Sequence, residues 1–122
     1  MNSKKLNSHK IVQDDRGVLT AIDGLETFQT KRFYLIECFK DMWRGEHYHK
    51  KCSQLICVLS GRINVKLNES GKKSEFVMEE GDTYLQLPNC KFAFSSAEDV
   101  SRIIVLCDMH HDPEEYVFGE PA

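Results

Sequence analysis

Two histidines separated by one residue, His47 and His49, are the side chains in this sequence best suited to chemistry. If they lie on a β-strand, side chains two residues apart point to the same face, so both imidazoles reach one space. An imidazole with its ordinary pKa of about 6.5 exchanges protons at neutral pH, and it is also a common metal ligand. The pair therefore suits either proton transfer or metal binding.

Two apolar segments are expected to position this pair. Residues 55–59, directly after the histidine segment, are predicted to form a strand that is buried on both sides. Residues 32–39 are rich in aromatic and branched side chains, which is typical of a central strand. If Tyr34 faces inward in that strand, Ile36 and Cys38 face inward as well.

Short strands separated by turn signals account for most of the chain, and a turn is also expected at Asp23-Gly24. The expected strands are residues 11–12, 18–22, 32–39, 55–59, 62–68, 75–78, 83–87, 91–95 and 102–107. A polar lead-in precedes them, and a short polar tail begins at about residue 110, with a helical turn over 113–116. This spacing of strands predicts an all-β sandwich or small barrel.

Length and composition predict one domain, residues 1–122, and exclude several classes of function. The 122-residue chain has a net charge of −3, so it shows no sign of a nucleic-acid-binding face. No apolar run approaches the roughly 20 residues that span a bilayer, and no signal peptide is evident. The five cysteines are odd in number and contain no C-x-x-C pair, which favours core thiols in a reducing cytoplasm.

The histidine segment also matches a known motif, because His47, His49, Gln54 and Gly61 have the spacing of the first cupin motif. Gly81 and Pro88 resemble the start of the second cupin motif, and together they imply a cupin-like jelly-roll sandwich or barrel. Metal-binding cupins have a glutamate at the position of Gln54 and a third histidine near Ala93. Because a catalytic metal site normally needs three protein ligands, we expect no metal here, unless a carboxylate such as Glu37 completes the set.

Three spaced segments narrow the resemblance further: residues 14–17 (Asp-Asp-Arg-Gly), 31–36 (Lys-Arg-Phe-Tyr-Leu-Ile) and 44–54. Together they resemble the cupin-type nucleotide-sugar 3,4-ketoisomerases. The resemblance implies a dTDP-linked 4-keto-6-deoxyhexose substrate, whose ketone moves from C4 to C3 without a metal or an organic cofactor. It also implies a homodimer and a product used for surface glycans such as lipopolysaccharide.

The resemblance assigns roles to individual residues. His49 is the expected proton shuttle, because the hydrogen on C3 is acidified by the adjacent ketone, and His47 is its acid/base or orienting partner. An enediolate forms in such a reaction and needs hydrogen-bond donors. The expected substrate-binding residues are Arg16, Tyr34, Arg44 and Gln54.

Two other functions stay open at this point. The ketoisomerases usually have a Trp-His pair after the late proline, and this chain has Phe92-Ala93 there. That departure favours a non-catalytic cupin module that binds a sugar nucleotide or another small ligand. A metal-dependent cupin enzyme, such as a dioxygenase, is the third candidate.

Overall fold

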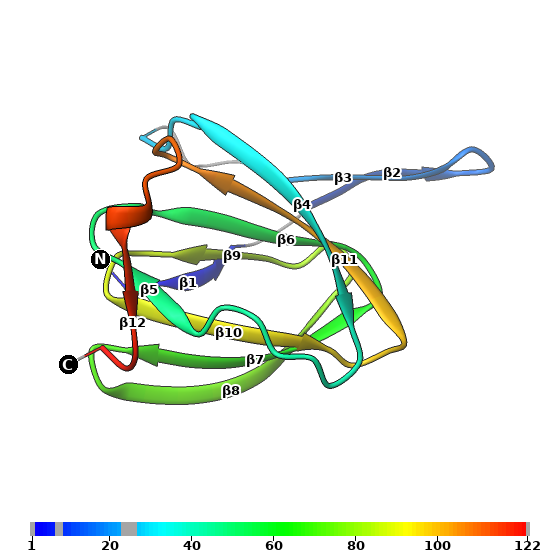
Figure 1. The fold of residues 1–122 in the computed structure, drawn as a ribbon. Helices are drawn as coiled ribbons and strands as arrows, with labels where there is room; N and C mark the ends of the chain where they lie inside the picture. Colours follow the sequence, from blue (N-terminus) through cyan, green and yellow to red (C-terminus); the bar gives the residue numbers. More distant parts are fainter. Residues whose placement is uncertain (1, 7–8, 23–26, 122) are drawn as a thin grey trace.

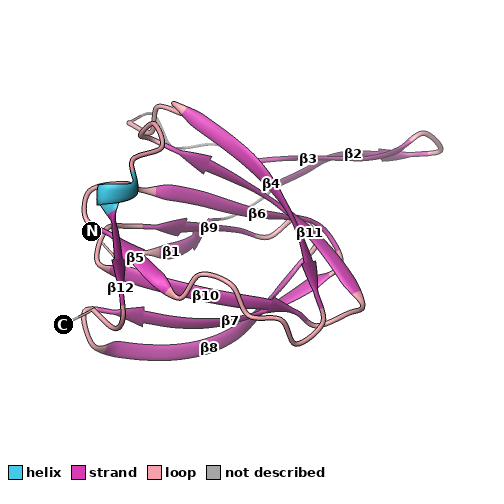
Figure 2. Ribbon diagram, viewed as in Figure 1, coloured by secondary structure: helices cyan, strands magenta, loops and turns pink. Residues whose placement is uncertain are grey.

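The computed structural model describes residues 2–6, 9–22 and 27–121, and strands make up most of it. Figure 1 shows two main sheets that face each other, with a long hairpin extending away from them. Figure 2 shows that one short helical turn is the only helix drawn in the described part of the chain. The expected all-β, cupin-like sandwich is confirmed.

The larger sheet has five antiparallel strands in the order β1-β9-β6-β11-β4. They are β1 (Lys4–Leu6), β9 (Thr83–Gln86), β6 (Gln54–Ser60), β11 (Val100–Cys107) and β4 (Arg32–Phe39). The β1 strand was not expected, because residues 2–10 have the composition of a polar lead-in. Ser3 holds it in place, since its hydroxyl donates to Glu69 and accepts from the amide of Leu87.

The second sheet has three antiparallel strands in the order β10-β7-β8. They are β10 (Cys90–Ser96), β7 (Arg62–Glu69) and β8 (Lys72–Glu79). The turn between β7 and β8 consists of Ser70 and Gly71 alone, and both have positive φ angles, as a type I′ hairpin turn requires. Pro88 follows β9 at the end of that strand, in agreement with the sequence.

Two smaller pairs of strands complete the fold. The histidine strand β5 (His47–His49) pairs with β12 (Tyr116–Phe118), which comes after the 3₁₀ turn η1 (Pro113–Glu115). The projecting hairpin consists of β2 (His9–Asp14) and β3 (Gly17–Ala21). The expected turn at Asp23-Gly24 lies outside the described residues.

The hydrophobic core lies between the two main sheets. In β4, Tyr34, Ile36 and Cys38 face inward as expected, because alternate side chains of the strand are more buried. The prediction for residues 55–59 is wrong in one respect. Ile56 and Val58 are buried, but Leu59 is 46% exposed, because within one chain the five-stranded sheet has a covered face and an open face.

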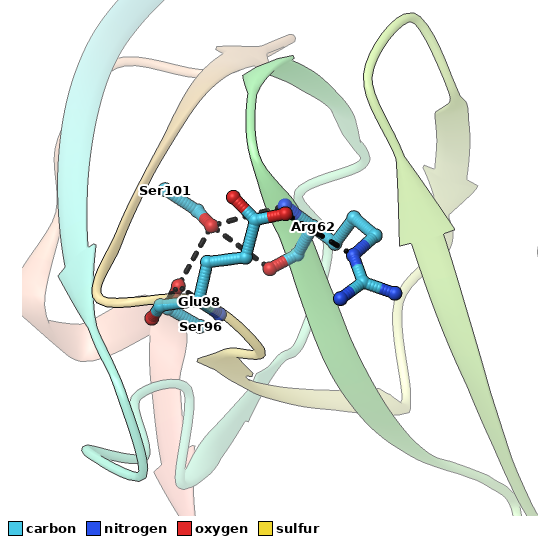
Figure 3. Close-up of polar contacts among 4 residues, drawn as sticks. All are labelled: Arg62, Ser96, Glu98 and Ser101. Carbon is cyan, nitrogen blue, oxygen red and sulfur yellow. Dashed lines mark hydrogen bonds and ion pairs between the residues drawn. The ribbon is translucent and has the colours of Figure 1, made fainter.

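The end of the sandwich where β6 turns into β7 is closed by a polar cluster (Figure 3). The hydroxyls of Ser96 and Ser101 lie 2.7 Å apart, and Ser101 also bonds both main-chain groups of Arg62. Gly61 makes this approach possible. A Cβ atom there would lie 2.3 Å from the Ser101 hydroxyl, and its φ of +81° disfavours any other residue.

Candidate active site

The opposite end of the sandwich contains a cavity of about 590 Å³. Its walls come from β4, β5, β6, β9, β10, β11 and β12 and from the loop that precedes β5. The side chains with polar or aromatic groups in its lining are Arg32, Tyr34, Trp43, Arg44, Glu46, His47, His49, Gln54, Gln86, Phe92, Phe94, Tyr116 and Phe118.

Strand β5 directs both histidines into this cavity. The centroids of the His47 and His49 rings lie 5.3 Å apart with the rings nearly perpendicular, as expected for side chains two residues apart on a strand. His47 is half-buried, and His49 is only 4% exposed. The Nδ1 atom of His49 is buried and has no hydrogen-bond partner within the described part of the chain.

A glycine allows β5 to lie close to β10. Gly45 has a φ of +81°, and a Cβ atom there would lie 2.2 Å from the main-chain oxygen of Phe92. The neighbouring Arg44 exchanges two backbone hydrogen bonds with Phe94. This close approach places the exposed Arg44 side chain in the lining of the cavity. It also places β5, which carries the two histidines, along the same cavity.

Burial changes the proton affinity of the pair. The pKa of His49 is lowered to about 4, chiefly by loss of hydration and also by the neighbouring His47, while Glu115 opposes the shift. The pKa of His47 is also lowered, again chiefly by burial. Both rings are therefore neutral at pH 7. The sequence predicted an ordinary pKa near 6.5, which is the value for an imidazole in water rather than in a buried site.

Tyr34 and Gln54 form a connected pair opposite the histidines. The amide Nε2 of Gln54 donates to the Tyr34 hydroxyl at 3.3 Å and to the Cys107 sulfur at 3.3 Å. Burial raises the pKa of Tyr34 to about 12, so the phenol keeps its proton. Because its oxygen already accepts from Gln54, the Tyr34 O–H group can donate into the cavity.

Arg16 is the one sequence-predicted residue that does not reach this cavity. It lies in the turn at the tip of the β2–β3 hairpin, which projects away from the sandwich (Figure 1). Its guanidinium forms an ion pair with Asp14 at 2.6 Å, and its side chain is 85% exposed. Within a single chain, His47, His49, Tyr34, Arg44 and Gln54 are thus brought together without Arg16.

The C-terminal strand supplies site residues that the sequence did not reveal. The ring centroid of Tyr116 lies 4.7 Å from that of His47 and 5.0 Å from that of His49, and Phe118 lies 5.9 Å from His47. The expected turn over residues 113–116 is confirmed by η1. In the sequence, the only indication of β12 is an aromatic residue at its first and third positions, Tyr116 and Phe118. So short a strand is recognisable only when its partner is known.

The donor set at the cavity does not match a metal centre. Across residues 2–6, 9–22 and 27–121, no group of three or more His, Cys, Asp or Glu side chains is placed to hold an ion. Glu37, the carboxylate considered from the sequence, forms an ion pair with Arg102 at 3.2 Å and is about half exposed. It does not join the two histidines.

The molecule is a cupin-like β-sandwich whose open end holds two neutral histidines, one buried and one half-buried, and a protonated tyrosine. More particularly, the chain belongs to the family described as FdtA, WxcM-like, C-terminal, whose model matches residues 1–120. Among the described residues, no helix is long and apolar enough to cross a bilayer.

Individual relatives agree with this assignment. The TDP-4-oxo-6-deoxy-alpha-D-glucose-3,4-oxoisomerase of Aneurinibacillus thermoaerophilus is 27% identical over 121 residues, which cover 96% of this chain and 86% of the relative. A 3,4-ketoisomerase structure from Helicobacter canadensis is 26% identical, with a TM-score of 0.84 and coverage of 96% and 90% of the two chains. The sugar 3,4-ketoisomerase QdtA from Thermoanaerobacterium thermosaccharolyticum, solved in complex with TDP, is 25% identical, with a TM-score of 0.84 and coverage of 95% and 87%.

Proposed function

We propose that this protein is a sugar-nucleotide 3,4-ketoisomerase. Its substrate is dTDP-4-keto-6-deoxyglucose, and it moves the ketone from C4 to C3 through an enediolate, by acid/base catalysis without a metal or a cofactor. The observation that carries the proposal is the pair of neutral imidazoles 5.3 Å apart in a cavity that also holds a protonated tyrosine. The names of the relatives supply the substrate class.

The proton movements fit the two histidines. A neutral imidazole, His49, removes the hydrogen from C3, which is acidified by the C4 ketone, and the electron pair forms the C3–C4 double bond of the enediolate. The same ring returns a proton to C4. The hydroxyl proton on O3 must also leave, and a proton must reach O4, and His47 lies close enough to share this work. No atom is gained or lost, so the isomerisation is balanced.

The enediolate oxygen needs donors that are already in position. Tyr34 is suited to this role, because Gln54 holds its oxygen and its proton stays bound at neutral pH. Arg44 provides a permanent positive charge at the cavity. Gln54 then acts through Tyr34, since both bonds of its Nε2 are made to protein groups rather than to an open space.

Metal-independent chemistry is favoured by the donor set. Two neutral histidines and an uncharged glutamine offer no carboxylate to balance a dication, and Glu37 is engaged with Arg102. Acid/base catalysis by the protein's own side chains needs only the groups that line the cavity. The cytoplasm is favoured as the compartment, because all five cysteines are free thiols.

A homodimer accounts for the exposed apolar surface and for the position of Arg16. Val18 and Leu19 on the hairpin are 56% and 52% exposed, and Phe33 and Leu35 on β4 are 65% and 66% exposed. We propose that these surfaces are covered by a second copy. If Arg16 contacts substrate, it does so in the cavity of the partner subunit.

Complementation tests this arrangement. Arg16→Ala and His49→Asn chains are each expected to be inactive alone. Mixed dimers should regain activity, because one of their two cavities has an intact His49 and an intact Arg16 from the other subunit. A monomer in sedimentation, or no recovery in verified mixed dimers, would contradict it.

Isotope exchange tests the function itself. Purified protein is incubated with dTDP-4-keto-6-deoxyglucose in D₂O and followed by NMR. Deuterium at C3 or C4 together with formation of the 3-keto sugar is expected, and it should persist in the presence of a chelator. Binding of the substrate without exchange would instead favour the non-catalytic module, and loss of turnover on chelation with recovery on metal addition would favour a metal enzyme.

A further inference from the structure

The loop after His49, residues 50–53, is held by residues 108–115, here called the C-terminal segment. The four consecutive backbone N–H groups of residues 50–53 all donate to it. The amide of Lys50 donates to the main-chain oxygen of Glu115 at 3.1 Å. The amides of Lys51 and Cys52 both donate to the Oε1 atom of Glu115, and the bond from Cys52 is 2.6 Å long. The amide of Ser53 donates to Oδ1 of Asp108 at 2.9 Å. Bonds of this kind to a carboxylate are charge-assisted and strong.

Glu115 is unusual because it is a buried acidic residue with no basic side chain among its hydrogen-bond partners in the described residues. It is 6% exposed and lies at the end of the η1 turn, where its own amide donates to the main-chain oxygen of Asp112. The next residue, Tyr116, begins β12 and packs against the His49 ring. The carboxylate and the aromatic wall of the site therefore belong to one continuous element.

Charged and titratable groups face His49 from several elements. They are His47 on β5, Arg32 on β4, Tyr116 on β12, Asp108 after β11 and Glu115 on η1. The small cavity that His49 shares with Glu115 is also lined by Cys52, Cys107, His110, His111 and Asp112. His47 and Arg32 disfavour the protonated imidazole, whereas Glu115 and Asp108 favour it. Of the two carboxylates, Glu115 has the larger effect on His49.

We propose that Glu115, with a smaller contribution from Asp108, is a positioning residue for His49. It fixes the loop that directly follows His49, and it keeps a negative charge beside an imidazole that burial would otherwise make a very weak base. The consequence for the reaction rate rests on the proposed isomerase function, but the effect on His49 does not. The carboxylate beside the proposed base His49 therefore comes from the C-terminal segment, at Glu115, and not from the histidine motif itself.

Glu115→Gln separates charge from geometry, because glutamine keeps an acceptor oxygen at the same reach and removes the charge. The titration of the His49 ring is followed by NMR in the protein without substrate, with His49→Asn identifying the signal. We expect the midpoint to move to lower pH in Glu115→Gln, while the exposed neighbour variant Glu114→Gln leaves it unchanged. With substrate present, kcat of Glu115→Gln should fall about tenfold or more, because the His49 base is weaker. The acid limb of the plot of kcat against pH should move to lower pH.

A purely structural role predicts a different result. If Glu115→Gln folds and the His49 midpoint does not move, the proposal is overturned. If Glu115→Gln does not fold, Asp108→Asn replaces it, with the same direction and a smaller shift expected, and an unmoved midpoint is again decisive against it. If the midpoint moves but the wild-type protein does not isomerise the sugar, the positioning role holds and the proposed function fails.

Discussion

The two ends of the sandwich both bury polar groups, but they treat them differently. At the closed end, Ser96 and Ser101 are fully buried, and their hydroxyls bond each other and the main chain (Figure 3). At the open end, His49 is nearly as buried, yet its Nδ1 atom has no partner among the described residues.

The difference shows how one fold separates stability from chemistry. A buried polar group without a partner costs on the order of 1–3 kcal/mol. At the closed end the hydroxyls of Ser96 and Ser101 avoid this cost by bonding each other and the main chain, although the adjacent Ser95 hydroxyl has no partner among the described residues. The open end bears this cost at His49, whose ring is proposed to contact the substrate. The compensation lies three and four residues further along, where Glu115 accepts from the amide of Cys52 and Asp108 accepts from the amide of Ser53. Variants at each end should therefore affect different properties.

The largest effect is expected from His49→Asn. This change removes the proposed base while keeping a polar side chain, so kcat should fall on the order of 10²–10⁴-fold. Binding of dTDP, measured by calorimetry, and the fold should be retained. His110→Asn, at an exposed position, is the matched control. Turnover close to that of the wild type would rule out His49 as the base.

Tyr34→Phe should have the next largest effect. It removes the O–H donor but leaves the ring in its half-buried position, so kcat is expected to fall on the order of 10²–10³-fold. Tyr48→Phe is the control, because Tyr48 lies between the two histidines on β5 but not in the cavity lining. If both variants have the same kcat, the Tyr34 hydroxyl does not stabilise the enediolate.

Between pH 6.5 and 4, the two histidines of the open end make the stability depend on pH. Burial holds the pKa of His49 near 4 in the folded state, against about 6.5 when unfolded. Between these values only the unfolded chain binds the proton, so the free energy of unfolding should decrease as the pH falls from 6.5 to 4, by on the order of 3 kcal/mol. Denaturant titrations should show a smaller decrease for His49→Asn. An identical decrease in both proteins would mean that His49 is not responsible.

Gly61→Ala should disturb only the closed end, with the smallest effect of the four. The added Cβ meets the Ser101 hydroxyl, so a loss of roughly 2 kcal/mol in the free energy of unfolding is expected, with kcat per folded molecule unchanged. Gly71→Ala has a similar positive φ but no atom within 4 Å of the new Cβ, so it measures the backbone strain by itself. Equal losses in both variants would show that the contact with Ser101 contributes nothing.

Much of the fold could be predicted because strand patterns are local. Residues 32–39 match β4 residue for residue, and the inward position of Tyr34 followed from alternation. The short strands β1 and β12 were missed because three residues carry too little periodicity. The outer face of β6 was misjudged because an apolar run does not say whether a second layer covers both of its sides.

That His47 and His49 share a face follows from the order of the amino acids alone, because it depends only on the two-residue period of a strand. The family could also be recognised from the sequence, because the three segments at residues 14–17, 31–36 and 44–54 have its characteristic spacing. The proton affinity of His49, the carboxylate that holds the next loop, and the separation of Arg16 from the cavity became apparent only in the folded chain. These depend on burial and on contacts between residues more than 60 positions apart, such as Cys52 with Glu115, which no local pattern records.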